Sequence, residues 1–169
     1  MKKFWKIFIC AAMIFSFASA NVSAAPAVEM SSDNIRDFMF KVNQELKKND
    51  PNNSLDTPAE KEKFFYYEDV VQLDESLSVK FVYVTKNDKM YFIRVKPSKL
   101  DDNAKTFLEG MTIVYFKAMG VSEETAKKLS KFGDGDEWQN EEVVSELNKK
   151  FAVKFKNSEI IIKAADSQK

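Results

Sequence analysis

The sequence predicts an α+β fold: a single domain with an antiparallel sheet of four to five strands packed with three to four helices. Residues 64–96 are rich in aromatic and β-branched side chains, which favour strands. Apolar residues recur at helical spacing over 33–48 and again over 101–119. Because strand-rich and helix-rich stretches are segregated along the chain, the pattern favours α+β over alternating βα units.

Three antiparallel strands are expected in the central stretch, at residues 64–73, 78–85 and 90–96. Polar residues at 74–76 and 86–89 separate them and suit turns, since Asn and Asp tolerate the left-handed backbone of tight hairpins. This three-stranded layer is the part of the sequence around which the other elements are expected to pack.

The register of the second and third strands decides which side chains face the core. A three-residue loop gives one face without charge, which carries Val79, Phe81 and Tyr83, and it segregates charge better than a two-residue loop does. The other face then carries four large apolar residues: Val82, Val84, Met90 and Phe92. A large uncovered apolar patch usually marks an interaction. These four residues are therefore candidate binding residues, with a covering helix as the alternative.

Four helices are expected around the sheet, over 33–48, 101–119, 122–129 and about 139–150. The second is apolar on nearly all sides in its C-terminal half, which predicts that it is buried on the charge-free sheet face. The third and fourth expected helices each have apolar residues at helical spacing along one side.

Two shorter segments have their own signals. Residues 49–58 contain two prolines and three asparagines and predict a loop, followed by a short helical turn over 59–63. Asn157-Ser158 favours a hairpin within residues 152–164.

The first 24 residues have the pattern of an export signal. Lysines precede an apolar run from Ile7 to Phe17, which is shorter than the ~20 residues that a bilayer span needs, and small residues follow it. Cleavage is expected before Asn21 or Ala25. We therefore expect a signal peptide in 1–24, one domain in 25–169, and an exported protein, periplasmic or extracellular, without a stable membrane anchor after cleavage.

Composition excludes several chemistries. The chain has no histidine, and its one cysteine, Cys10, lies inside the expected signal. A Ser-His-Asp triad, thiol catalysis and thiolate metal sites are therefore absent from the exported chain. The four glycines match no phosphate-binding loop. An exported domain without disulfides fits a bacterial protein better than a small eukaryotic secreted one.

The charge balance argues against nucleic-acid binding. Without the three lysines of the signal, 23 basic residues stand against 26 acidic ones, whereas nucleic-acid binding needs a basic face. We expect no cofactor.

Two groups of carboxylates are candidate sites. Asp134, Asp136 and Glu142 are candidate calcium ligands, although Trp138 stands where an EF-hand pattern has Asp or Asn. The alternative is that these acids cap the fourth helix. A second group could form a paired-carboxylate site, with a solvated sheet edge as the alternative; its members are Glu68, Asp69, Asp74 and Glu75.

The function predicted from these features is a small exported bacterial protein that acts as a non-enzymatic binding or accessory module. It would recognise a protein or a small apolar ligand through the sheet face or a cleft beside the loop at 49–58. The alternatives are a carboxylate- or metal-dependent hydrolase and an inhibitor of a secreted enzyme that presents this loop.

Overall fold

The computed structural model describes residues 28–62 and 65–166, and the expected signal peptide lies outside them. Within this part of the chain the helices are α1 (Ile35–Asn49), α2 (Asp102–Ala118), α3 (Glu123–Ser130) and a short 3-10 helix (Ser145–Leu147). The strands are β1 (Ala59–Glu62), β2 (Tyr66–Gln72), β3 (Ser78–Lys86), β4 (Lys89–Pro97), β5 (Trp138–Val144), β6 (Lys149–Lys156) and β7 (Glu159–Asp166). No described helix is long and apolar enough to cross a membrane.

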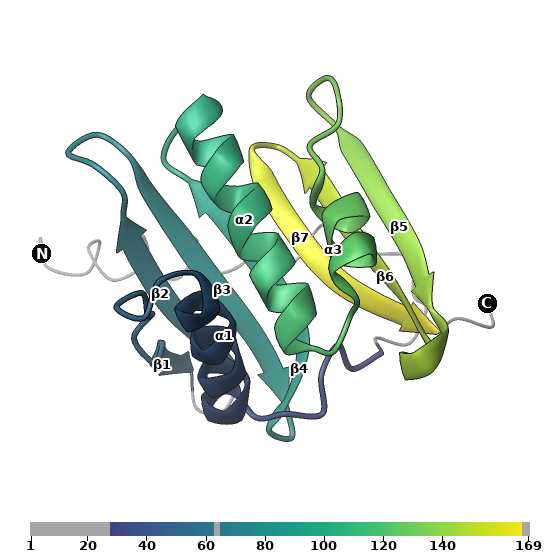
Figure 1. The fold of residues 1–169 in the computed structure, drawn as a ribbon. Helices are drawn as coiled ribbons and strands as arrows, with labels where there is room; N and C mark the ends of the chain where they lie inside the picture. The colour runs from purple at the N-terminus through teal and green to yellow at the C-terminus, as the bar shows by residue number, and fades with distance from the viewer. Residues whose placement is uncertain (1–27, 63–64, 167–169) are drawn as a thin grey trace, which may run out of the picture.

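The strands form one sheet in the order β1-β2-β3-β4-β7-β6-β5, and every neighbouring pair is antiparallel. All three α-helices lie on one face of this sheet (Figure 1). The predicted α+β class is confirmed, and so are the three strands expected within 64–96. The sheet has seven strands rather than four to five, because two segments expected to be helical are strands.

The largest difference from the sequence prediction is β5, which occupies residues expected to form the fourth helix. Its side chains alternate between more and less exposed positions, and Val143, which helical spacing placed inside, is 54% exposed. The Asn140 side chain donates to the carbonyls of Leu129 and Lys131 at 3.0 and 2.5 Å, which ties this edge strand to the end of α3. The pattern thus fits period two, and the helical spacing was coincidental. Likewise β1 forms where a helical turn was expected.

Two-residue turns close the β3–β4 and β6–β7 hairpins. The residues at the tips, Asn87-Asp88 and Asn157-Ser158, all have φ between 51° and 60°, as type I′ turns require. The predicted hairpin at 157–158 is confirmed. The predicted three-residue loop after β3 was wrong, and a bulge at Tyr91 supplies the extra residue instead.

With this bulge, most side chains of β3 and β4 lie on the predicted face of the sheet, but Met90 lies on the opposite one. Phe81 pairs with Val95 and Tyr83 with Ile93. The charge-free face is therefore present, although each of these β3 residues pairs with a β4 residue two positions later than predicted. Thr85 pairs with Met90, which is therefore on the helix-covered face and is 0% exposed.

The central helix α2 packs against the charge-free face, as its apolar sequence predicted. Tyr115 contacts the rings of Phe81 and Tyr83 edge-on, at centroid distances of 6.0 and 6.1 Å. Phe38 of α1 joins the same cluster. The hydroxyl oxygens of Tyr83 and Tyr115 lie 2.8 Å apart, and both side chains are 0% exposed. This pair is therefore a fully buried polar contact of the core.

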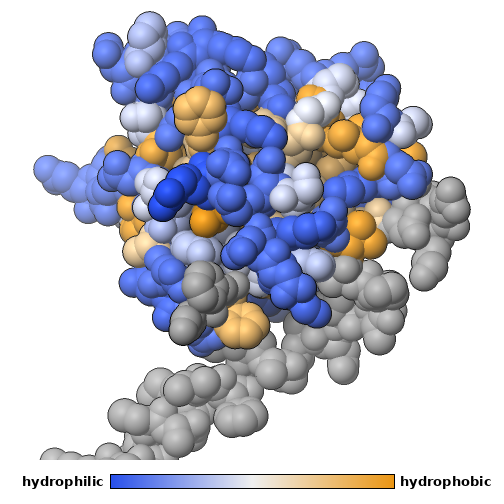
Figure 2. Space-filling view, turned by 90° about the horizontal axis from the view of Figure 1, so that it is seen from below, coloured by the Kyte–Doolittle hydropathy of each residue, from blue (hydrophilic) through white to orange (hydrophobic). Residues whose placement is uncertain are grey.

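The segment before α1 joins the lower end of the sheet. Val28 bridges to Ala164 and Ser31 to Met90, so the segment lies between the ends of β7 and β4. The Lys149 ammonium donates to the Met30 carbonyl at 3.4 Å, and burial lowers the pKa of this lysine. Viewed from this end, the surface is mostly hydrophilic, and its apolar side chains form small separate groups (Figure 2).

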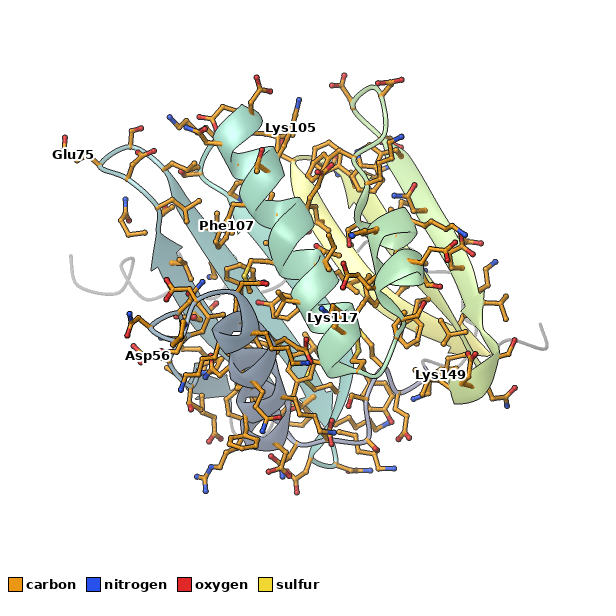
Figure 3. The ribbon with its side chains drawn as sticks, viewed as in Figure 1. Asp56, Glu75, Lys105, Phe107, Lys117 and Lys149 are labelled. Atoms are coloured by element: carbon orange, nitrogen blue, oxygen red, sulfur yellow. The ribbon has the colours of Figure 1, made fainter. Side chains whose placement is uncertain are left out.

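An ion-pair network joins the three helices on the same sheet face. Lys117, near the C-terminal end of α2 (Figure 3), lies 3.5 Å from Glu45 of α1 and 3.2 Å from Glu123 of α3. Hydrogen bonding to Glu123 is the largest cause that raises the pKa of Lys117. Gly120, with φ of 87°, ends α2 as predicted, because this left-handed conformation suits glycine.

Candidate functional site

The sheet face opposite the helices is not covered by any helix of the described residues (Figure 1). Its side chains align in rows across the strands, as the ladder registers give them. The first row is Glu68–Val82–Arg94–Ile161–Lys154–Gln139, and the second is Tyr66–Val84–Phe92–Lys163–Ala152–Glu141. A third is made of Val70–Lys80–Lys96 and of Glu159–Lys156. We call the residues of these rows the open face.

The open face has an apolar centre. Five neighbouring large side chains are half-buried: Tyr66, Val82, Val84, Phe92 and Ile161. Beside them Ala152 is buried, and Val70 near the edge is 59% exposed. No described helix packs over these side chains (Figure 1). The covering helix considered as the alternative is therefore not found in the described part of the chain.

The open face is also basic. It carries Lys80, Arg94, Lys96, Lys154, Lys156 and Lys163 against Glu68, Glu141 and Glu159. These six basic and three acidic residues give a net charge of +3. Since the whole chain carries 26 of each kind, the remaining residues carry −3. The open face thus carries a net charge opposite in sign to that of the rest of the chain.

Arg94 lies at the middle of the open face, between Val82 and Ile161. Its guanidinium carbon is 5.6 Å from the centre of the Phe92 ring, within reach of a cation–π contact. Its Nε is 4.0 Å from Glu159, and this buried nitrogen donates no hydrogen bond to a described residue. Arg94 is therefore held in the open face by its contact with Phe92 and by a long ion pair with Glu159.

The structure brings three of the four predicted binding residues together. Val82, Val84 and Phe92 are neighbours on the open face, whereas Met90 lies in the core on the other face because of the bulge. Their role in binding remains a prediction. Sequence analysis did not select Arg94 or Ile161, since only the sheet order reveals that β7 lies beside β4.

The three predicted metal ligands do not converge. Asp134 and Asp136 are exposed in the loop before β5. Glu142 lies on the helix-covered side of β5, close enough to raise the pKa of Lys128, although Glu124 is the larger cause. In residues 28–62 and 65–166, no group of three or more acidic side chains is placed to hold a metal ion.

The paired-carboxylate group is also dispersed. Glu68 and Asp69 are successive residues of β2, so they point to opposite faces, and Glu68 pairs with Lys80 at 2.5 Å. Burial raises the pKa of Asp69. The Asp74 carboxylate accepts backbone hydrogen bonds within its own turn, and Glu75 lies at the tip of that loop (Figure 3).

The loop after α1 is braced from the helix. The Asn43 amide donates to the Leu55 carbonyl at 2.9 Å and accepts from the Leu55 N–H at 2.7 Å. Residues 50–54 and 56–57 are exposed around this anchor. The bracing fixes the path of the loop beside β2.

Fold and surface together define an α+β domain whose antiparallel sheet has one helix-covered face and one open, basic face. No protein-family model, curated protein or solved structure matches the chain.

Proposed function

We propose that this protein is a non-enzymatic, exported binding module whose open face docks an acidic protein surface that has an apolar centre. The observation that carries the proposal is the sheet face that no described helix covers, on which a half-buried apolar cluster is surrounded by excess positive charge. Apolar contacts supply affinity, and the lysines select an acidic partner.

The dimensions of the open face suit a protein partner. Six strands spaced by about 4.8 Å, each with about seven residues, give a surface of roughly 600 Å². A standard specific interface buries about 800 Å² on each partner. A partner that covers the open face and one of its edges therefore reaches the usual size, whereas a small molecule would cover only part of the surface.

The composition of the open face matches the general anatomy of an interface. Interfaces have an apolar core, often with aromatic residues and arginine, and a polar rim. Here Phe92, Tyr66 and Arg94 lie among valines, and lysines lie around them. Among the described residues, no ion pair joins Lys96 or Lys154 to an acidic group. Both lysines are thus placed to meet acidic groups of the partner.

Site-specific photo-crosslinking in the native cells tests the proposal. A benzoylphenylalanine replaces Phe92 on the open face or, as a control, Phe40, which is 64% exposed on α1. We expect a discrete adduct with one acidic protein from position 92 and none from position 40. The double substitution Lys96→Glu/Lys154→Glu should abolish the adduct, because it reverses the charge that faces the partner.

A matched charge control uses Lys47→Glu/Lys131→Glu, which changes the net charge equally at two exposed positions outside the open face. This variant should keep the adduct. The proposal fails if neither position gives an adduct, if both give the same adducts, or if the position-92 adduct is a second copy of this chain or a lipid.

A further inference from the structure

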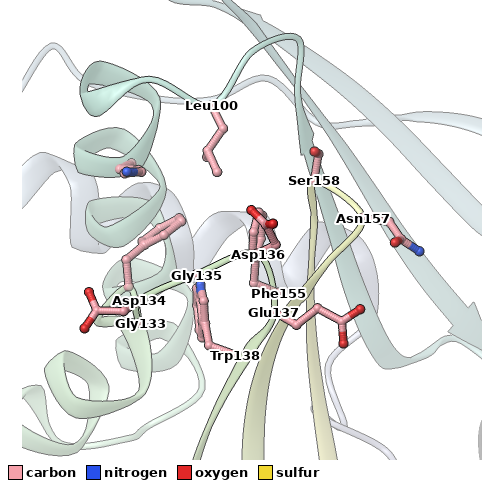
Figure 4. A pocket seen from close by; sticks show the side chains of 12 residues that line it. Leu100, Gly133, Asp134, Gly135, Asp136, Glu137, Trp138, Phe155, Asn157 and Ser158 are labelled. Carbon is pink, nitrogen blue, oxygen red and sulfur yellow. The ribbon is translucent and has the colours of Figure 1, made fainter.

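A second site, separate from the open face, lies on the helix side where α2 begins and α3 has ended. A depression of about 600 Å³ opens between the loop at 133–137, the β6–β7 turn and the start of α2 (Figure 4). Ligand pockets commonly measure about 300–1,000 Å³. The space is therefore sufficient for a small organic molecule.

Three aromatic rings line this depression. Trp138 stacks on Phe155 at a centroid distance of 5.8 Å, and Phe132 meets Trp138 edge-on at 5.1 Å. Phe155 is buried, whereas Phe132 and Trp138 are half-buried and keep part of their rings at the surface. Gly133 permits this arrangement, since an added Cβ would lie 2.8 Å from Trp138.

Carboxylates dominate the rim. Asp134, Asp136 and Glu137 line the depression, with Lys105 as the basic residue of the lining. Glu137 forms an ion pair with Lys156 at 2.9 Å, but no ion pair joins either aspartate to a described basic group. The lining thus carries a net charge of −2, which is opposite in sign to the open face.

We infer that this aromatic depression binds a small organic cation of the quaternary ammonium type. Ring electrons attract a cation held within about 6 Å of an aromatic face, and Trp gives the strongest contact. The two unpaired aspartates add attraction without taking part in the fold. A cation with methyl groups also removes apolar ring surface from water, which a metal ion would not do.

Calorimetric titration of the purified protein with choline, and with its neutral isostere 3,3-dimethylbutan-1-ol, tests the inference. The two probes have the same shape and differ in charge. We expect choline to bind at least about tenfold more tightly than the isostere. Addition of choline should also shift the indole N–H resonance of Trp138.

Two variants separate the contributions of charge and aromatic surface. Asp134→Asn/Asp136→Asn, in an exposed loop, should weaken choline binding severalfold without affecting folding. Trp138→Leu should abolish the binding. The control Asp56→Asn/Glu75→Gln removes equal charge far from the depression (Figure 3) and should leave affinity unchanged.

Three results would overturn the inference. They are equal binding of choline and its isostere, no binding of choline, and an affinity that survives the aspartate substitutions. None of these results tests the open face. A negative result here would therefore leave the proposed docking function unaffected, and failure of the docking function would leave this inference unaffected.

Discussion

The hydroxyl pair of Tyr83 and Tyr115 offers a quantitative test of the core. Both side chains are 0% exposed, and their oxygens lie 2.8 Å apart. Replacing either residue by Phe removes one hydrogen bond and leaves the other hydroxyl buried without its partner. Leaving a buried hydroxyl without its partner costs about 1–3 kcal/mol. Each single variant should therefore lose about 2 kcal/mol of unfolding free energy.

The double variant Tyr83→Phe/Tyr115→Phe should behave differently. It removes both polar groups together, so no buried hydroxyl is left unpaired, and the apolar rings around it accept the change. Replacing both partners by apolar groups of the same shape is nearly neutral. We expect a loss of about 1 kcal/mol or less, and hence a coupling energy of about 3 kcal/mol between the two positions.

Urea unfolding followed by circular dichroism measures these differences through the denaturation midpoint at constant slope. The informative quantity is the double variant compared with the sum of the single variants. If the two losses simply add, to about 4 kcal/mol, the hydroxyls are not mutual partners and this description of the core is wrong.

Three further predictions concern pH and the helices. Burial raises the pKa of both core tyrosines. Near and above pH 10 the unfolded chain therefore releases phenol protons that the native state retains. The free energy of unfolding should thus be lower at about pH 10.5 than at about pH 8. This decrease should be smaller in the double Phe variant, which lacks both phenols. Urea midpoints at the two pH values measure this, and an equal fall in both proteins would contradict it. Asn34 accepts the Asp37 N–H at 2.9 Å at the start of α1, so Asn34→Ala should cost about 1 kcal/mol and Asn34→Ser much less. Thermal unfolding decides this, and equal effects would exclude a capping role. Lys117→Met should cost about 1 kcal/mol, because Glu45, with 14% of its side chain exposed, loses one of its partners. The exposed Lys128→Met is its control, and equal losses would show that the network joining the helices adds nothing.

The sequence predicted those parts of the fold that depend on local pattern. The all-round apolar stretch of α2 required burial, and the Asn-Ser pair at 157–158 required a tight turn; both are present. It failed for β5, where Val143, Val144 and Leu147 are spaced like one face of a helix, although the backbone pairs with β6. Periodicity over so short a segment does not separate strand from helix.

The open face was predictable only in part. Val82, Val84 and Phe92 follow from alternation along two strands, and the structure places them together. Met90 was misplaced because alternation assumes an uninterrupted ladder, and nothing in its neighbours signals the bulge at Tyr91. The contribution of Ile161 depends on long-range strand order, which local patterns do not determine.

The aromatic depression depends on the same long-range order. Phe132, Trp138 and Phe155 come from a loop and two strands, and the β5–β6 pairing places Trp138 opposite Phe155. Sequence analysis selected the neighbouring aspartates as metal ligands. Their charge was recognised, but the aromatic surface beside them was not.

Cysteine protection measures directly whether the open face is occupied. In a Cys10→Ser background, Val70→Cys places a thiol on the open face, and Phe40→Cys places one on the outer side of α1. These positions are similarly exposed, at 59% and 64%. In the purified protein both should react with maleimide at similar rates. In the native cells the thiol at position 70 should be protected and the one at position 40 should not. Equal reactivity in the cells would mean that nothing docks on the open face, and would contradict the proposed function.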